Sequence, residues 1–167
     1  MRTVVVQAHP LAASYSAALA DHVVRGLGEA GIEPAVFRLG EGERPDTDTL
    51  RAATRLVLVH PTWWGGQPAM LLDWLHEVMN DQRRPLAGVR RLTSVTSCGS
   101  SQLVNRMQGE WGRRYAERQV AAACAPDVVV EWLPLYKIDR QPQHVITAHL
   151  RSVQQRFAGQ DQALTNR

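Results

Sequence analysis

Three short segments of the chain gather residue types suited to binding a flat ligand that carries a phosphate. The first, residues 9–16, holds an imidazole, a phenol and two hydroxyls (His9, Tyr15, Ser14 and Ser16) just before a helical pattern. Backbone N–H groups at the start of a helix, with such side chains beside them, can hold a phosphate. The alternative is that Ser14 or Ser16 only caps the helix. Residues 9–16 are therefore a candidate phosphate site.

The second segment, residues 61–68, places two adjacent tryptophans before two glycines. The glycines allow a ligand to approach the backbone closely, and the indoles offer a stacking wall for a flat aromatic ring. The alternative is that one tryptophan belongs to the core and the other to a dimer contact, and the pattern leaves both open. The candidate residues here are Pro61, Thr62, Trp63, Trp64 and Gly65.

The third segment, residues 96–99, is small and rich in hydrogen-bond donors: Thr96, Ser97, Cys98 and Gly99. It could line the same ligand site as the other two segments. The alternative is an ordinary turn between a strand and a helix.

The elements around these segments alternate between short β-rich runs and longer helical patterns. We expect strands at residues 3–8, 32–39, 56–60, 92–97 and 128–135, and helices at 16–30, 69–79 and 142–157. A short helix is expected from Asp46 or Thr47 to Thr54, and a longer one over 100–123, interrupted at Gly109 and Gly112. This alternation predicts an α/β fold with a five-stranded, parallel, doubly wound sheet in the order 2-1-3-4-5. The three segments then meet at the carboxyl ends of the strands, where such sheets bind ligands.

Length and composition narrow the class of protein. The chain of 167 residues suits one domain, which we place at 1–159 with 160–167 as a frayed tail. The net charge of +3 is dispersed, which argues against a nucleic-acid partner. No apolar run approaches the roughly 18 residues of a membrane span, and the first residues read as a strand rather than a signal peptide. Two cysteines make no disulfide framework, so we expect a cytoplasmic protein.

Three other patterns in the sequence give weaker evidence about function. A GxGxxG match at residues 26–31 closes a helix instead of opening one, so helix termination is the better interpretation. The histidines have no metal-ligand spacing, and we expect no metal site. Arginines crowd the helix after the fourth strand and suit either the 2′-phosphate of NADPH or a solvated surface: Arg106, Arg113, Arg114 and Arg118.

Together the three segments resemble the flavodoxin-like NAD(P)H:quinone oxidoreductases, a flavodoxin-2 type family. His9, Ser14, Tyr15 and Ser16 match that family's first loop. A Pro-x-x-Trp-x-x-x-Pro-Ala loop with a later tryptophan is matched by Pro61, Trp64, Pro68, Ala69 and Trp74. Residues 96–99 match its Thr-Thr-Gly-Gly loop imperfectly, and residues 132–140 resemble small bacterial members.

The resemblance implies an oxidoreductase that passes hydride from NAD(P)H through bound FMN to a quinone-like acceptor. FAD is the less favoured flavin because the chain lacks the C-terminal extension of the largest members. His9, Ser14 and Ser16 would contact the flavin phosphate region, and Trp63, Trp64 and Gly65 would lie along the ring. Thr96 and Gly99 would lie at the edge of the ring. The family also implies a homodimer with two sites at the subunit interface.

One departure from the family concerns the proton donor. Larger relatives carry a tyrosine near the hydride site, and Val104 stands at that position here. We therefore assign no catalytic proton donor.

Two rival functions remain open at this point. One is a flavodoxin-type electron carrier, which the positive charge and the paired tryptophans disfavour. The other is an ancillary regulatory subunit of a membrane transporter, for which no residue marks a docking surface.

Overall fold

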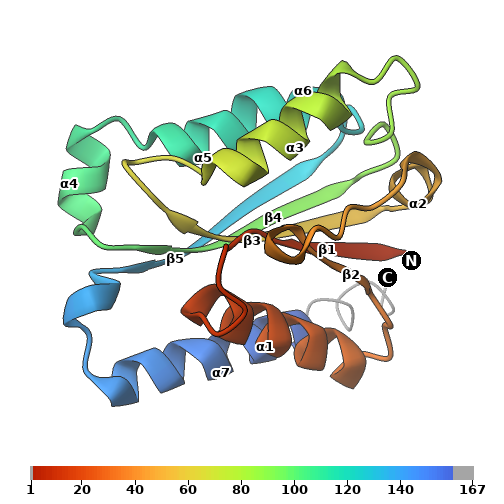
Figure 1. The fold of residues 1–167 in the computed structure, drawn as a ribbon. Helices are drawn as coiled ribbons and strands as arrows, with labels where there is room; N and C mark the ends of the chain where they lie inside the picture. The colour runs from red at the N-terminus through yellow and green to blue at the C-terminus, as the bar shows by residue number, and fades with distance from the viewer. Residues whose placement is uncertain (1, 160–167) are drawn as a thin grey trace.

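The computed structural model describes residues 2–159, which form a five-stranded sheet between two layers of helices (Figure 1). The strands are β1 (Thr3–Gln7), β2 (Ala35–Arg38), β3 (Arg55–Thr62), β4 (Arg91–Cys98) and β5 (Val129–Tyr136). Their order is β2-β1-β3-β4-β5, and every neighbouring pair is parallel. The predicted fold class and strand order are confirmed. The predicted frayed tail, residues 160–167, lies outside the described residues.

The helices cover both faces of the sheet, as Figure 1 shows. On one face lie α1 (Tyr15–Glu29) and α7 (Gln143–Gly159), and on the other lie α3 (Ala69–Asn80), α5 (Trp111–Tyr115) and α6 (Ala121–Ala123). Side chains of β3 alternate between the two cores: Val57 joins the cluster under α1, and Leu58 joins the cluster under α3. Because both faces are buried, β3 reads as a continuous apolar run in the sequence. No helix among residues 2–159 is long and apolar enough to cross a membrane.

The segment between β4 and β5 corrects one prediction. It contains α4 (Gln102–Met107), α5, a π-helical turn η2 (Ala116–Val120) and α6, and the chain breaks at Gly109 as expected. Gly112 does not interrupt a helix but lies inside α5. Packing explains the glycine at position 112, because a Cβ there would lie 3.3 Å from the carbonyl oxygen of Gly65. A sequence pattern cannot distinguish a glycine that breaks a helix from one that lets it approach a loop.

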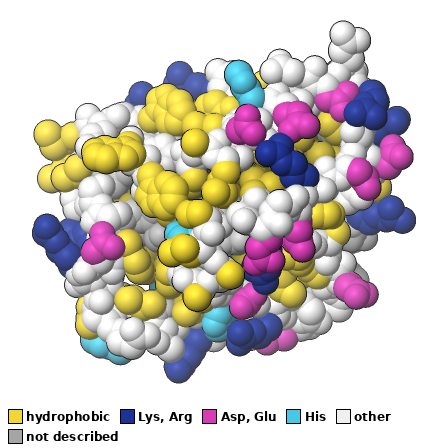
Figure 2. Space-filling model, viewed as in Figure 1, with side chains coloured by type: hydrophobic (Ala, Val, Ile, Leu, Met, Phe, Trp, Pro, Cys, Tyr) yellow, Lys and Arg dark blue, Asp and Glu magenta, His cyan; other side chains and the backbone are white. Residues whose placement is uncertain are grey.

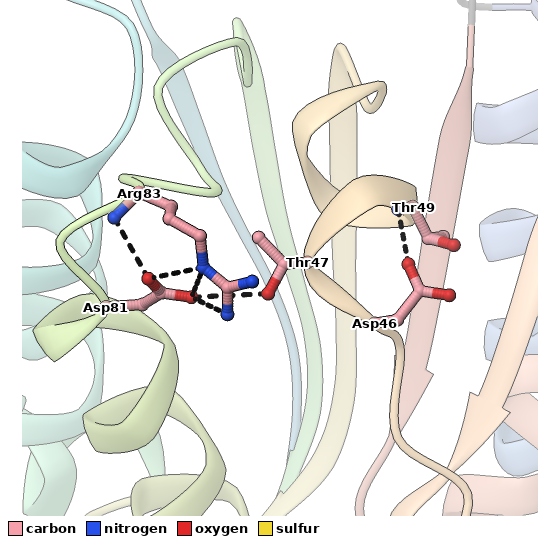
Figure 3. A network of polar contacts seen from close by, with 5 residues as sticks. All are labelled: Asp46, Thr47, Thr49, Asp81 and Arg83. Atoms are coloured by element: carbon pink, nitrogen blue, oxygen red, sulfur yellow. Dashed lines mark hydrogen bonds and ion pairs between the residues drawn. The ribbon is translucent and has the colours of Figure 1, made fainter.

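A polar network fixes α2 (Thr47–Arg51) near the end of α3 (Figure 3). The Asp81 carboxylate accepts a bond of 2.9 Å from Arg83 Nε and one of 3.2 Å from the Thr47 hydroxyl. These bonds from Arg83 lower the pKa of Asp81 to about 2. Asp46 caps α2 by accepting from the Thr49 N–H at 2.7 Å. The network follows the last turn of α3 and stabilises the packing of α2 there.

Candidate functional site

A cleft of about 720 Å³ lies where the loops after β1, β3 and β4 meet the turn after β5. This volume is within the range of small-molecule and cofactor sites. The cleft brings together most of the residues that the sequence predicted, and it adds two that it did not. Its lining consists of His9, Tyr15, Ser16, Pro61, Thr62, Trp63, Trp64, Ser97, Gly99, Ile138 and Asp139.

The loop after β1 holds His9 in one orientation. Its Nδ1 accepts a hydrogen bond of 3.0 Å from the Leu11 N–H. Its ring meets Trp63 edge to face, with centroids 5.6 Å apart. A side chain at Gly40 would collide with the His9 carbonyl, so the short helix η1 (Leu39–Glu41) packs directly on this loop. The imidazole is therefore held at one wall of the cleft.

The start of α1 forms a second wall. Ser14 is the N-cap, and its Oγ accepts from the Ala17 N–H at 3.1 Å. Ser14 does not line the cleft, so its side chain has the capping role that the sequence left open as an alternative. Ser16 is buried and does line it. The first turn of α1 carries no acidic residue, which favours an anion at this helix end.

Tyr15 connects the cleft to α7. Its hydroxyl lies 2.8 Å from Nδ1 of His149, a bond that joins the start of α1 to the far helix of the same layer. Burial raises the pKa of Tyr15 and lowers the pKa of His149. Both groups are therefore neutral at pH 7, and the pair holds the Tyr15 ring in place.

The loop after β3 presents two indoles. Trp63 and Gly66 exchange backbone hydrogen bonds of 2.9 and 3.0 Å, which close a tight turn. Trp64 and Gly65 inside it have positive φ values of 52° and 81°, the pattern of a type I′ turn. Trp64 is fully exposed, although positive φ strains a bulky residue. The turn therefore places an indole at the rim of the cleft at a cost in backbone strain.

Helix α5 supports this turn from behind. The Gly112 N–H donates to the Gly65 carbonyl at 3.0 Å, and the Gln67 amide donates to the Gly112 carbonyl at 2.8 Å. A Cβ at Gly66 would lie 2.5 Å from the Trp111 ring, so only glycine fits beneath that indole. Gly65 thus contacts α5 and does not line the cleft, in contrast to its predicted place.

The loop after β4 supplies the floor. Ser97 and Gly99 line the cleft, whereas Thr96 and Cys98 do not. The Thr96 hydroxyl lies 2.8 Å from the Thr62 hydroxyl and ties β4 to β3. Cys98 is buried, and burial raises the pKa of its thiol. Its Sγ is consequently a neutral, packed group at pH 7.

Sequence reasoning missed Ile138 and Asp139, which line the cleft from the turn after β5. The signal was available, because the order 2-1-3-4-5 places β5 beside β4 and its carboxyl end at the same edge. Val104, at the position of the family tyrosine, lies on α4 and does not line the cleft. Among residues 2–159 there is no group of three or more histidines, cysteines or carboxylates able to hold a metal.

The profile of a family described as having a flavodoxin-like fold (Flavodoxin_2) matches residues 1–124. The chain belongs to this family. No curated protein sequence matches the chain.

Solved structures agree with this family over nearly the whole chain. Smu.1420 from Streptococcus mutans UA159 has a TM-score of 0.82 at 17% identity, covering 95% of this chain and 99% of that one. An NAD(P)H:quinone oxidoreductase from Methanothermobacter marburgensis has a TM-score of 0.77 at 16% identity, covering 95% and 98%. An FMN-dependent NADH-azoreductase from Bacillus anthracis str. Ames Ancestor, in complex with FMN, has a TM-score of 0.74 at 12% identity, covering 95% and 98%. At these identities the likeness shows the fold.

Proposed function

We propose that this flavodoxin-like protein is a flavin-dependent NAD(P)H oxidoreductase that binds FMN in the cleft. The observation that carries the proposal is the pairing, in one cleft, of an acid-free helix start with two projecting indoles. The first suits a phosphate and the second a flat aromatic ring, and FMN has both. The oxidoreductase and azoreductase named above support the same class of reaction by their structural likeness.

The side chains of the cleft fit this cofactor. The first turn of α1, with the buried Ser16 hydroxyl beside it, would hold the phosphate. Trp63 and Trp64 would cover the ring, and Gly99, with the Asp139 carboxylate beside it, would lie at the edge of the ring. When bound, the flavin supplies the chemistry of accepting a hydride and passing it on.

The residues of the protein would bind, orient and shield the flavin. The α1–α7 bond through Tyr15 and the α5 contacts behind Gly65 fix the two walls before a ligand arrives. Such a preformed site loses little entropy on binding. Tyr15, which lines the cleft, is neutral at pH 7 because burial raises its pKa, so it supplies no charged acid or base there. Because no proton donor is assigned among the cleft residues, we assign the protons that accompany reduction of the acceptor to solvent.

The finer features follow from the family resemblance. We assign NAD(P)H as the hydride donor, a quinone-like compound as the acceptor, and the cytoplasm as the location, where the free Cys98 and Cys124 stay reduced. We also assign a homodimer, because apolar side chains of α4 and α5 stand exposed beside the cleft: Leu103, Val104, Met107 and Trp111. Figure 2 shows hydrophobic side chains gathered over α4 and the loop after β3.

The test is a titration of the purified protein with FMN and with riboflavin, followed by quenching of flavin fluorescence. Riboflavin has the same ring but no phosphate. We expect FMN to bind at least about tenfold more tightly, the ratio that a charge-assisted phosphate contact of about 1.4 kcal/mol gives. Equal affinity for both would contradict the phosphate site at α1, and binding of neither would contradict the flavin.

A further inference from the structure

We infer that Asp139 sets the electrostatic potential of the cleft and thereby lowers the reduction potential of a flavin bound there. This inference rests on the proposed function and assigns to it a residue that was not among the predicted site residues. Asp139 lies on η3 (Ile138–Arg140), the turn that follows β5, and it is the acidic residue in the cleft lining.

The position of Asp139 is defined by its contact with the floor of the cleft. Its Oδ2 lies 2.9 Å from the place that a Cβ at Gly99 would take. Real Cβ atoms do not approach neighbours this closely, so a side chain at position 99 would displace the carboxylate from the place that it takes beside Gly99. The negative charge therefore rests against the backbone at the end of β4, beside the edge where a flat ring would lie.

The turn that carries Asp139 is fixed at both ends. Lys137 adopts a positive φ of 56°, which reverses the chain directly after β5. Its N–H donates to the Ser100 carbonyl at 3.1 Å, which ties the turn to the loop after β4. The Gln141 amide donates to the Tyr136 carbonyl at 3.0 Å and closes the other end. These bonds hold the backbone of Asp139 near Gly99.

The charge of Asp139 is not neutralised by a bonded partner. Within residues 2–159 the carboxylate makes no hydrogen bond or ion pair, although Lys137 and Arg140 are its near neighbours in sequence. Other aspartates do find arginines: Asp127 pairs with Arg90 at 3.2 Å, and Asp21 with Arg38 at 3.1 Å. His9, whose Nδ1 accepts a hydrogen bond from the Leu11 N–H, also lines the cleft.

An unpaired carboxylate has a definite effect on hydride transfer into this cleft. The nicotinamide donor gives up a hydride, which is two electrons and one proton, and leaves as the oxidised, positively charged form. The cleft then holds one additional negative charge until a solvent proton follows. A fixed negative charge nearby raises the free energy of that state because like charges repel, and since Asp139 is exposed, solvent screens part of this repulsion. Asp139 therefore makes the bound flavin a stronger reductant.

The experiment measures the midpoint potential of FMN bound to the wild type, to Asp139→Asn and to Asp139→Glu, against a reference dye. The control is Asp48→Asn, which removes one exposed carboxylate on α2, outside the cleft lining. We expect Asp139→Asn to favour the reduced form by about tenfold, which for a two-electron couple is about 30 mV. Asp139→Glu, which keeps the charge, and the control should stay near the wild type.

The possible results distinguish a failure of the proposed function from a failure of the inference about Asp139. If the wild type binds no FMN, the proposed function fails and the inference fails with it. If all proteins bind FMN and Asp139→Asn has the wild-type potential, the inference alone is wrong. If Asp139→Glu shifts as far as Asp139→Asn, the role of Asp139 is steric rather than electrostatic, and the inference is again overturned.

Discussion

At the scale of single residues, the molecule places two unfavourable groups next to its cleft. Trp64 has a strained backbone and a fully exposed indole. His60, at the carboxyl end of β3, is wholly buried with an Nε2 that has no hydrogen-bond partner in the described structure. Features that cost stability persist where function or a surrounding packing requirement maintains them. We expect a functional reason for Trp64 and a packing reason for His60, and each expectation can be tested.

Trp64 is expected to serve the ligand and not the fold. Changing Trp64→Ala removes no buried contact, so the midpoint of thermal unfolding should stay within about 2 °C of the wild type, as for surface changes of under 0.5 kcal/mol. Loss of one aromatic contact of about 1 kcal/mol should weaken FMN binding about fivefold. Val129→Ala, an exposed apolar residue at the start of β5, is the matched control. Unchanged FMN affinity in Trp64→Ala would remove the indole from the site.

His60 is expected to make stability depend on pH. Burial lowers its pKa to about 4, below the ordinary value of 6.5, and only a bond of its Nδ1 to the Pro61 carbonyl opposes this. The unfolded chain therefore binds the proton more readily. Its contribution to the unfolding free energy falls as pH drops below about 6.5, reaches about −3 kcal/mol near pH 4 and then levels off.

The measurement for His60 is urea unfolding at several pH values. His60→Asn, which cannot titrate, should show a shallower loss of unfolding free energy between pH 6.5 and 4 than the wild type. His76→Asn, a change of an exposed histidine, should follow the wild-type curve. Parallel curves for the wild type and His60→Asn would show that the imidazole is not the group that titrates.

At the scale of elements, close approach through glycine determines how the cleft is built. The turn after β3 is not held by its own hydrogen bonds alone. Helix α5 packs against it through Gly112, which contacts Gly65 and Gly66 of the turn. This contact joins residues far apart in the sequence. Because the contact is long-range, the sequence places the loops at the strand ends but does not reveal that α5 packs against Gly65.

The same scale shows where sequence reasoning succeeds. Periodicity and turn residues define β1, β3, β4 and the long helices to within a few residues, since these elements are built from local patterns. The strand order follows from general rules of chain connection. The side-chain roles of Ser14 and Cys98 depend on neighbours that the sequence does not reveal, and so does the entry of Asp139 into the cleft.

The support of α5 for the turn yields a prediction at Gly66. A methyl group there would meet the Trp111 ring, so Gly66→Ala should lower the unfolding free energy by about 1–3 kcal/mol, the usual cost of overpacking. The same change should have little effect in Trp111→Ala, where the ring is gone. Gly28→Ala in α1, which meets nothing within 4 Å, is the control and should be neutral or stabilising. Full additivity of Gly66→Ala and Trp111→Ala would contradict the contact.

At the scale of the whole molecule, one apolar surface lies beside the cleft without a partner. Leu103 and Met107 on α4 are more than half exposed, and Trp111 on α5 is about half exposed. Clustered exposed apolar residues usually mark an interaction site. A second copy of the chain is the partner that the proposed function assigns.

The predicted dimer is tested by sedimentation equilibrium. We expect the wild type to be a dimer at micromolar concentration, and Met107→Glu, which places a charge in the interface, to shift it to monomer. The control Asp48→Asn should leave the mass unchanged. A monomeric wild type at all concentrations would contradict the homodimer while leaving the cleft of each chain as described.

The measurement that bears most directly on the central claim is an anaerobic absorption spectrum of the FMN-loaded protein before and after addition of NADPH or NADH. The account predicts that the visible band of the bound flavin bleaches with at least one of the two nicotinamides and returns when a quinone is added. A bound flavin that neither nicotinamide bleaches would contradict the assignment as an NAD(P)H oxidoreductase.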